Sequence, residues 1–176
     1  MLKRHLAVIL SCCSISAFAA NATPFDQEIG VAKCPDVVKS LSSKVSFTAD
    51  GVNRYTGGEM YIGDAKDLGL SRAKTILLIC DKNTVLSGLI LTLDTKVFDQ
   101  YKKILTSKYK QVKLINPFVG NKYAKYVKGN SVILLDEPHM SFNTTVTYAT
   151  KDLMKNFDTI NKQEDQNIVK HQQNSL

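Results

Sequence analysis

The sequence predicts an α+β protein with an antiparallel sheet, helices packed on one face of it, and a ββα–ββα order that suggests an internal repeat. Three observations predict this class. Short apolar runs with strand-like alternation are separated by turn residues. Two segments carry apolar residues at helical spacing. The order strand, strand, helix occurs in residues 75–109 and again in residues 132–162.

The N-terminal part predicts one helix and two short strands. Pro35 suits the first turn of a helix that runs to about Ser42. The elements expected after it are a strand at Lys44–Ala49, turns at Asp50-Gly51 and Gly57-Gly58, a strand at Glu59–Ile62, and a loop or single helical turn at Gly63–Ala73.

The middle of the chain gives the clearest pattern. Thr75–Cys80 is a β-type apolar run, and Leu86–Leu93 alternates between apolar and other residues. Asp94 or Thr95 is then expected to cap an amphipathic helix. Its apolar residues are Val97, Phe98, Tyr101, Ile104, Leu105 and Tyr109.

The last third follows the same plan. Leu77–Asp81 aligns without a gap with Val132–Asp136, 55 residues later, which is the basis for the predicted repeat. The expected elements are strands at Val112–Ile115, Tyr123–Val127, Val132–Leu135 and Phe142–Tyr148, and a helix that begins at Thr150. One domain is expected over residues 23–162, followed by a polar flexible tail at 163–176.

Residues 1–22 have the pattern of a signal peptide. A basic start is followed by the apolar stretch Leu6–Phe18 and by small residues at two cleavage motifs, which end at Ala19 and Ala22. The sequence favours cleavage after Ala22, and cleavage after Ala19 is the alternative. A lipid anchor at Cys12 or Cys13 is the less favoured alternative. The pattern predicts an exported, periplasmic protein with no transmembrane segment in the remainder.

Cleavage would leave two cysteines, Cys34 and Cys80. In an oxidising compartment such a pair is expected to form a disulfide. A reactive thiol is the alternative, but no Cys-x-x-Cys occurs and Cys80 follows the apolar run Ile76–Ile79.

The best candidate for catalysis is the segment around His139. Asp136, Glu137 and Ser141 are the other members of a set that could perform acid–base or hydrolytic chemistry. No metal-ligand spacing or nucleophile elbow accompanies them, so no metal and no cofactor is predicted. A simple Pro-fixed connection between two strands is the competing interpretation.

The second candidate is a lysine-rich stretch. Residues 96–128 hold nine Lys and a single acid, Asp99, with tyrosines between them. An anionic partner would suit this stretch, whereas the absence of Arg disfavours nucleic acid. A solvated surface that maintains solubility is the alternative. The binding residues expected are Lys102, Lys103, Lys110, Lys122, Tyr123, Lys125 and Tyr126.

Several features together resemble small exported proteins of unassigned function in Gram-negative bacteria. They are the signal peptide, the Cys in an early helix, the Leu78–Asp81 strand, the helix ending at Lys108-Tyr109, and the segment Pro138–Phe142. The resemblance implies, by size and plan, a periplasmic inhibitor or immunity-type protein. The sequence thus predicts a non-enzymatic binding protein with an unidentified protein or anionic envelope component as partner. A small periplasmic hydrolase is the alternative, and the oligomeric state is left open.

Overall fold

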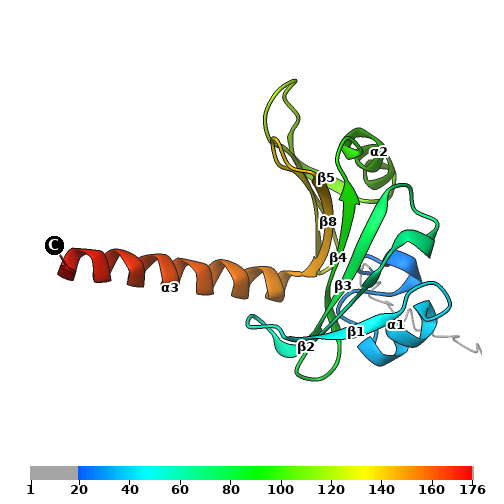
Figure 1. Ribbon diagram of the computed structural model, residues 1–176, viewed down its shortest axis with the longest axis horizontal. Helices are drawn as coiled ribbons and strands as arrows, with labels where there is room; N and C mark the ends of the chain where they lie inside the picture. The colour runs from blue at the N-terminus through cyan, green and yellow to red at the C-terminus, as the bar shows by residue number, and fades with distance from the viewer. Residues whose placement is uncertain (1–19, 176) are drawn as a thin grey trace, which may run out of the picture.

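The structure, a computed structural model, describes residues 20–175 and is built on one antiparallel sheet of eight strands (Figure 1). The strands are β1 (Phe47–Val52), β2 (Gly57–Asp64), β3 (Ala73–Asp81), β4 (Leu86–Asp94), β5 (Lys110–Ile115), β6 (Lys122–Lys128), β7 (Ser131–Glu137) and β8 (Asn143–Thr150). Their spatial order is β1-β2-β3-β4-β8-β7-β6-β5. The α+β class and the antiparallel sheet are therefore confirmed.

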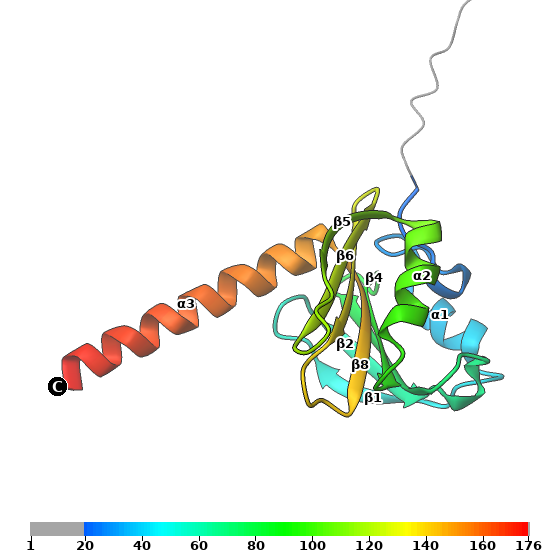
Figure 2. The same ribbon diagram turned by 90° about the horizontal axis from the view of Figure 1, so that it is seen from above.

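Two helices cover one face of the sheet, which we call the inner face. They are α1 (Cys34–Leu41) and α2 (Phe98–Lys108), and both lie on the same side in the two views (Figures 1 and 2). Two short 3-10 helices, Pro24–Asp26 and Lys66–Leu68, complete the helical segments before β5. The opposite face, which we call the outer face, carries no helix along most of its width.

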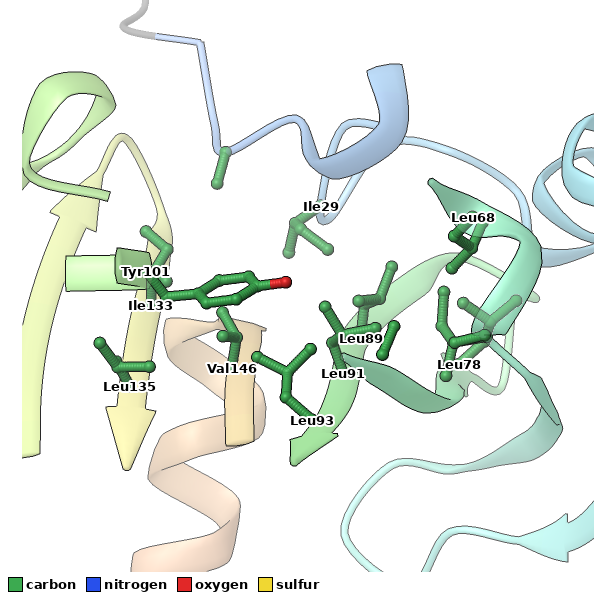
Figure 3. Packing of buried hydrophobic residues seen from close by; sticks show 14 of the residues in the cluster. Ile29, Leu68, Leu78, Leu89, Leu91, Leu93, Tyr101, Ile133, Leu135 and Val146 are labelled. Carbon is green, nitrogen blue, oxygen red and sulfur yellow. The ribbon is translucent and has the colours of Figure 1, made fainter. Parts of the chain in front are cut away.

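The inner face holds the main core because side chains along the strands alternate between the two faces, apart from local register shifts. Leu89, Leu91 and Leu93 of β4 are buried there beside Ile133 and Leu135 of β7 (Figure 3). Residues of α2 cover this core, and Tyr101 reaches into it among the β-strand side chains (Figure 3). Its hydroxyl donates a hydrogen bond of 3.0 Å to the Ser71 carbonyl, so the buried phenol is satisfied.

The helix that follows β8 differs from the expectation that all helices pack on one face. α3 (Lys151–Ser175) starts against the outer face, where Leu153 forms a small cluster with Ile79 and Ala149. Gly88 lies directly beneath this helix, since an added Cβ would stand 2.8 Å from a Leu153 methyl group. The reason is the alternation of β8, in which Val146 faces inward and Ala149 therefore faces outward.

The same helix is also longer than predicted. The sequence reading ends it near Lys162, but α3 continues to Ser175 and leads away from the sheet (Figure 1). No Gly or Pro interrupts residues 151–175, and Gln, Glu and Lys are good helix formers. Thr150 caps it as expected, because its Oγ1 accepts a hydrogen bond of 3.1 Å from the Leu153 amide.

The strand order is symmetric about the pairing of β4 with β8. Leu91 lies opposite Val146, and these residues are 55 apart, the same offset as in the predicted sequence repeat. Each half of the sheet is a four-stranded meander followed by a helix, so the ββα units predicted from the sequence are the ends of larger ββββα units. A duplication of the sequence stays a prediction.

Other helix and strand boundaries differ from the predicted ones by a few residues. β1 begins at Phe47 and includes Asp50-Gly51, which the sequence reading treated as a turn. α2 begins one residue after Val97, and no side chain caps it, so neither Asp94 nor Thr95 has the predicted role. Phe142 lies before β8 rather than in it. No helix among residues 20–175 has the length and apolar character that crossing a membrane requires.

The residues before α1 are part of the fold. Cys34 and Cys80 form a disulfide with a Cα–Cα distance of 6.2 Å, which joins the start of α1 to β3 as predicted. The Gly30 amide donates to the Leu86 carbonyl, and the Leu86 amide donates to the Ala32 carbonyl. This segment is therefore tied to the sheet by both covalent and hydrogen bonds.

Candidate functional site

Three of the four candidates for catalysis, Glu137, His139 and Ser141, line one shallow depression, but no hydrogen bond joins their side chains to one another in the described chain. The side chain of Glu137 is almost fully buried on the inner face and is held by other groups: Thr144 Oγ1 donates to its Oε2 at 2.6 Å, and the Lys96 amide donates to the same atom at 3.0 Å. Lys122 Nζ lies 3.5 Å from its Oε1. Glu137 therefore fixes the β4–α2 connection to β7 and β8.

The other three candidates make different contacts. Ser141 Oγ is used in a turn, since it donates to the Asn143 carbonyl and accepts from the Asn143 amide, each at 3.0 Å. His139 is exposed, and only its backbone amide makes a hydrogen bond within residues 20–175, to Asn121 Oδ1 at 2.7 Å. Asp136 faces outward, and partial burial raises the pKa of its carboxyl. The structure thus separates Asp136 from the other three candidates, which line one depression without hydrogen bonds between their side chains.

The lysines and tyrosines of the predicted binding surface lie on both sides of the sheet and do not form one surface. Lys102, Lys122 and Tyr126 belong to the inner side, where Tyr126 is 0% exposed and is a core residue. Lys102 contacts Asp99 Oδ1 at 2.6 Å, and this hydrogen bond lowers the pKa of the Asp99 carboxyl. Lys103 is exposed on α2. Tyr126 must therefore be removed from the predicted binding surface, and Lys102 and Lys122 already have acidic partners.

Three lysines of β5 and β6 lie on the outer face and form what we call the lysine strip: Lys110, Lys113 and Lys125. Lys113 and Lys125 are paired across the two strands, and Lys113 Nζ lies 5.7 Å from the centre of the Tyr123 ring. None of the three forms an ion pair with an acid in the part of the chain that the structure describes. Burial, and then the charge of Asp136, raise the pKa of the Tyr123 hydroxyl, so Tyr123 stays neutral beside the strip.

A second feature lies at the end of the same strands. The β5–β6 and β7–β8 loops run side by side there (Figures 1 and 2) and carry four large apolar side chains, Phe118, Val119, Met140 and Phe142. Their exposed fractions are 101%, 67%, 86% and 83%, respectively. We call these four residues the loop-tip patch. It borders a shallow depression of about 610 Å³, which Lys96 and Lys122 also line.

The sequence reading missed this patch for a physical reason. Phe142 continues the alternation of Thr144 and Val146, so the pattern places it in the strand, whereas β8 begins one residue later. Phe118 and Val119 lie between Pro117 and Gly120, and this position is the feature of the sequence from which the patch could be predicted. Apolar residues inside a Pro–Gly connection have no strand or helix to bury them.

A smaller apolar pocket of about 330 Å³ lies on the outer face beneath the start of α3. Leu77, Ile90 and Leu134 line its floor, and Tyr55 and Phe157 form one side, with ring centres 5.0 Å apart. Arg54 joins the β1–β2 turn to Glu164 of α3 at 2.7 Å, so this turn supports the helix.

No group of three or more His, Cys, Asp or Glu side chains suited to a metal ion occurs within the described range 20–175. The geometry therefore offers two surfaces, the lysine strip and the loop-tip patch, at neighbouring parts of β5 and β6. Comparisons of this chain with protein-family models, with curated proteins and with solved structures find no match.

Proposed function

We propose that this chain is a binding protein that uses the lysine strip of β5 and β6 to recognise an anionic partner in the cell envelope. The observation that carries the proposal is the unneutralised positive charge of Lys110, Lys113 and Lys125 on an uncovered sheet face. An inhibitor or immunity-type protein is one form that such a binding protein takes. Glu137, His139 and Ser141 line one depression, but no hydrogen bond joins any two of their side chains within residues 20–175, and this gives no support to the hydrolase alternative.

The edge position of β5 strengthens the argument. All six residues of β5 are exposed, and its outer edge has no neighbouring strand in the described sheet. Lysines on an edge strand oppose self-pairing, because a second copy would bring like charges together. The same charges attract an acidic group, and they act over about 8–10 Å at physiological salt. The arrangement therefore favours a foreign anionic partner over a second copy of this chain.

Neutralising Lys113 and Lys125 is expected to weaken partner binding at least about fivefold, mainly through slower association. The test immobilises the wild type and the Lys113→Gln/Lys125→Gln variant, exposes both to envelope extract, and identifies the retained material by mass spectrometry at increasing salt. A Lys44→Gln/Lys155→Gln variant, which alters exposed lysines elsewhere, is the matched control. Equal retention by all three proteins at every salt concentration would refute the proposal.

We further propose that the chain is exported and that its signal peptide is removed after Ala19. The predicted signal peptide falls almost wholly on residues 1–19, outside the described residues, but Asn21 and Ala22 are within them. Ala22 is 0% exposed in the core, its amide donates to Ser131 Oγ at 3.1 Å, and its carbonyl accepts from the Ile29 amide. The Asn21 side chain donates to the Ile29 carbonyl and accepts from the Asn130 amide at 2.7 Å. These contacts favour Ala19 over the Ala22 site preferred from the sequence.

The purified exported protein is therefore expected to begin Ala20-Asn21-Ala22. N-terminal sequencing and intact-mass measurement, after expression of the full gene in a Gram-negative host, check this start. Blocking the first site with Ala19→Arg should abolish or shift processing, whereas Ala22→Arg should leave the cleavage position unchanged. A mature protein that begins Thr23-Pro24 would contradict the proposal.

A further inference from the structure

We infer that the loop-tip patch inserts into the surface of an anionic phospholipid bilayer while the surrounding lysines contact its head groups. The inference rests on the proposed function, since it names the chemistry of the anionic partner. Phe118, Val119, Met140 and Phe142 come from two neighbouring loops and are the most exposed cluster of large apolar side chains in the described chain. A contiguous exposed patch of this kind marks a protein or membrane contact.

Hydrogen bonds within and between the two loops lower the cost of moving their apolar tips out of water. The Ser141 amide donates to the Pro138 carbonyl, and Ser141 Oγ bonds the backbone of Asn143 in both directions. Asn121 Oδ1 accepts from the His139 amide, which links the β5–β6 loop to the β7–β8 loop. Backbone groups that are satisfied within the β7–β8 loop reduce the penalty for that loop of entering a medium that offers few hydrogen bonds.

The charge around the patch has the sign that an anionic head group requires. Lys96 and Lys122 line the depression beside the tips, and Lys113 follows along β5. Two acids of this region are engaged: Glu137 is buried among Thr144, Lys122 and the Lys96 amide, and Asp94 pairs with Lys74 at 2.7 Å. A third, Asp136, lies on the outer face and forms no ion pair in the described chain. Long lysine side chains can keep their charge at the head groups while their carbon chains lie along apolar surface.

The position of the loops suits a flat surface. They reach past the ends of the strands, while α3 leads away in another direction (Figure 1). A second copy is disfavoured as the occupant because the lysines of the two patches would repel each other. A bilayer that carries phosphate groups satisfies the apolar tips and the lysines together.

The test measures co-sedimentation of the purified exported protein with vesicles of equal parts phosphatidylglycerol and phosphatidylcholine, and with vesicles of phosphatidylcholine alone. We expect binding to the anionic vesicles that is at least about tenfold stronger than to the neutral ones and that weakens with salt. The Phe118→Ser/Phe142→Ser variant is expected to lose about tenfold or more, because two aromatic side chains no longer enter the bilayer. The Val31→Ser/Val52→Ser variant, which removes exposed valines elsewhere, should bind as the wild type does.

A fluorescence measurement reports insertion directly, because the chain contains no Trp. In the Phe118→Trp variant, emission should move to shorter wavelength when anionic vesicles are added, and in the Val52→Trp control it should not. Unchanged melting temperatures of all variants confirm that the exposed substitutions leave the fold intact.

The outcomes separate this inference from the proposed function. Loss of vesicle binding in the Lys113→Gln/Lys125→Gln variant, without loss in the Phe118→Ser/Phe142→Ser variant, would refute insertion and retain an electrostatic anionic partner. Absence of wild-type vesicle binding, together with lysine-dependent capture of an acidic protein from envelope extract, would also overturn the inference while supporting the proposed function. Absence of both would overturn the two proposals together.

Discussion

Replacing both Cys34 and Cys80 by alanine is expected to lower the free energy of unfolding by about 4 kcal/mol. The disulfide closes a loop with a sequence separation of 46 residues, and the chain-entropy relation gives this magnitude for the constraint that it places on the unfolded chain. Both cysteines are buried, and they join the N-terminal segment and α1 to the central part of the sheet. For a domain of this size the loss corresponds to a melting temperature lower by roughly 10 °C.

Urea denaturation of the wild type and the double variant measures this difference, and the wild type in reducing buffer provides a second estimate. Thiol labelling of the denatured, non-reduced protein establishes that the disulfide is present. Two free thiols in the protein purified without reductant, or equal unfolding midpoints with and without reductant, would show that the bond has no such role.

Reversing the charge of Lys122 is expected to destabilise the protein by about 2 kcal/mol. The side chain of Glu137 is 9% exposed and that of Lys122 is 26% exposed, so Lys122→Glu would set a second carboxylate beside one that cannot move into water. Breaking a fully buried ion pair lowers the stability by more than this, and the loss is smaller here because Lys122 is partly exposed. Charge reversal of a lysine without such a contact would leave stability almost unchanged, so the contact with Glu137 is the reason for the larger effect.

Lys125 provides the matched comparison, because it lies on the same strand but faces the other side of the sheet. Lys125→Glu is expected to shift stability by no more than about 0.5 kcal/mol. Thermal unfolding of both variants at neutral pH, followed by circular dichroism, checks the contrast. Equal melting temperatures would mean that the Lys122–Glu137 contact contributes nothing to the folded state.

The sequence predicts the sheet better than it predicts the helices. The alternation in Leu86–Leu93 and Phe142–Tyr148 identifies strands because each buries one face, and the register of Leu91 opposite Val146 follows from that alternation. The face on which α3 packs is not readable in the same way. It depends on whether residue 149 or 150 is the last residue of β8 before the chain turns into the helix. Such a boundary is uncertain by more than one residue at the sequence level.

The candidate site is even less readable from the sequence than the position of α3. A count of lysines finds the charged stretch 96–128. Successive residues of β6 face opposite sides of the sheet, however, so Lys122 and Tyr126 lie on the inner face and Lys125 lies on the outer face. Composition alone cannot make that division, and it cannot tell that Phe118 and Phe142 meet at one end of the sheet. Their proximity depends on the pairing of β6 with β7, which brings two loops together from positions more than twenty residues apart.

Hydrogen exchange of the purified protein, with and without anionic vesicles, tests the central claim most directly. The claim is that the lysine strip and the loop-tip patch form one binding face for an anionic partner. It predicts slower exchange in residues 110–128 and 137–143 when phosphatidylglycerol vesicles are present, with β1, α1 and residues 151–175 unchanged. Protection confined to α3 or to β1, or no protection anywhere, would contradict it.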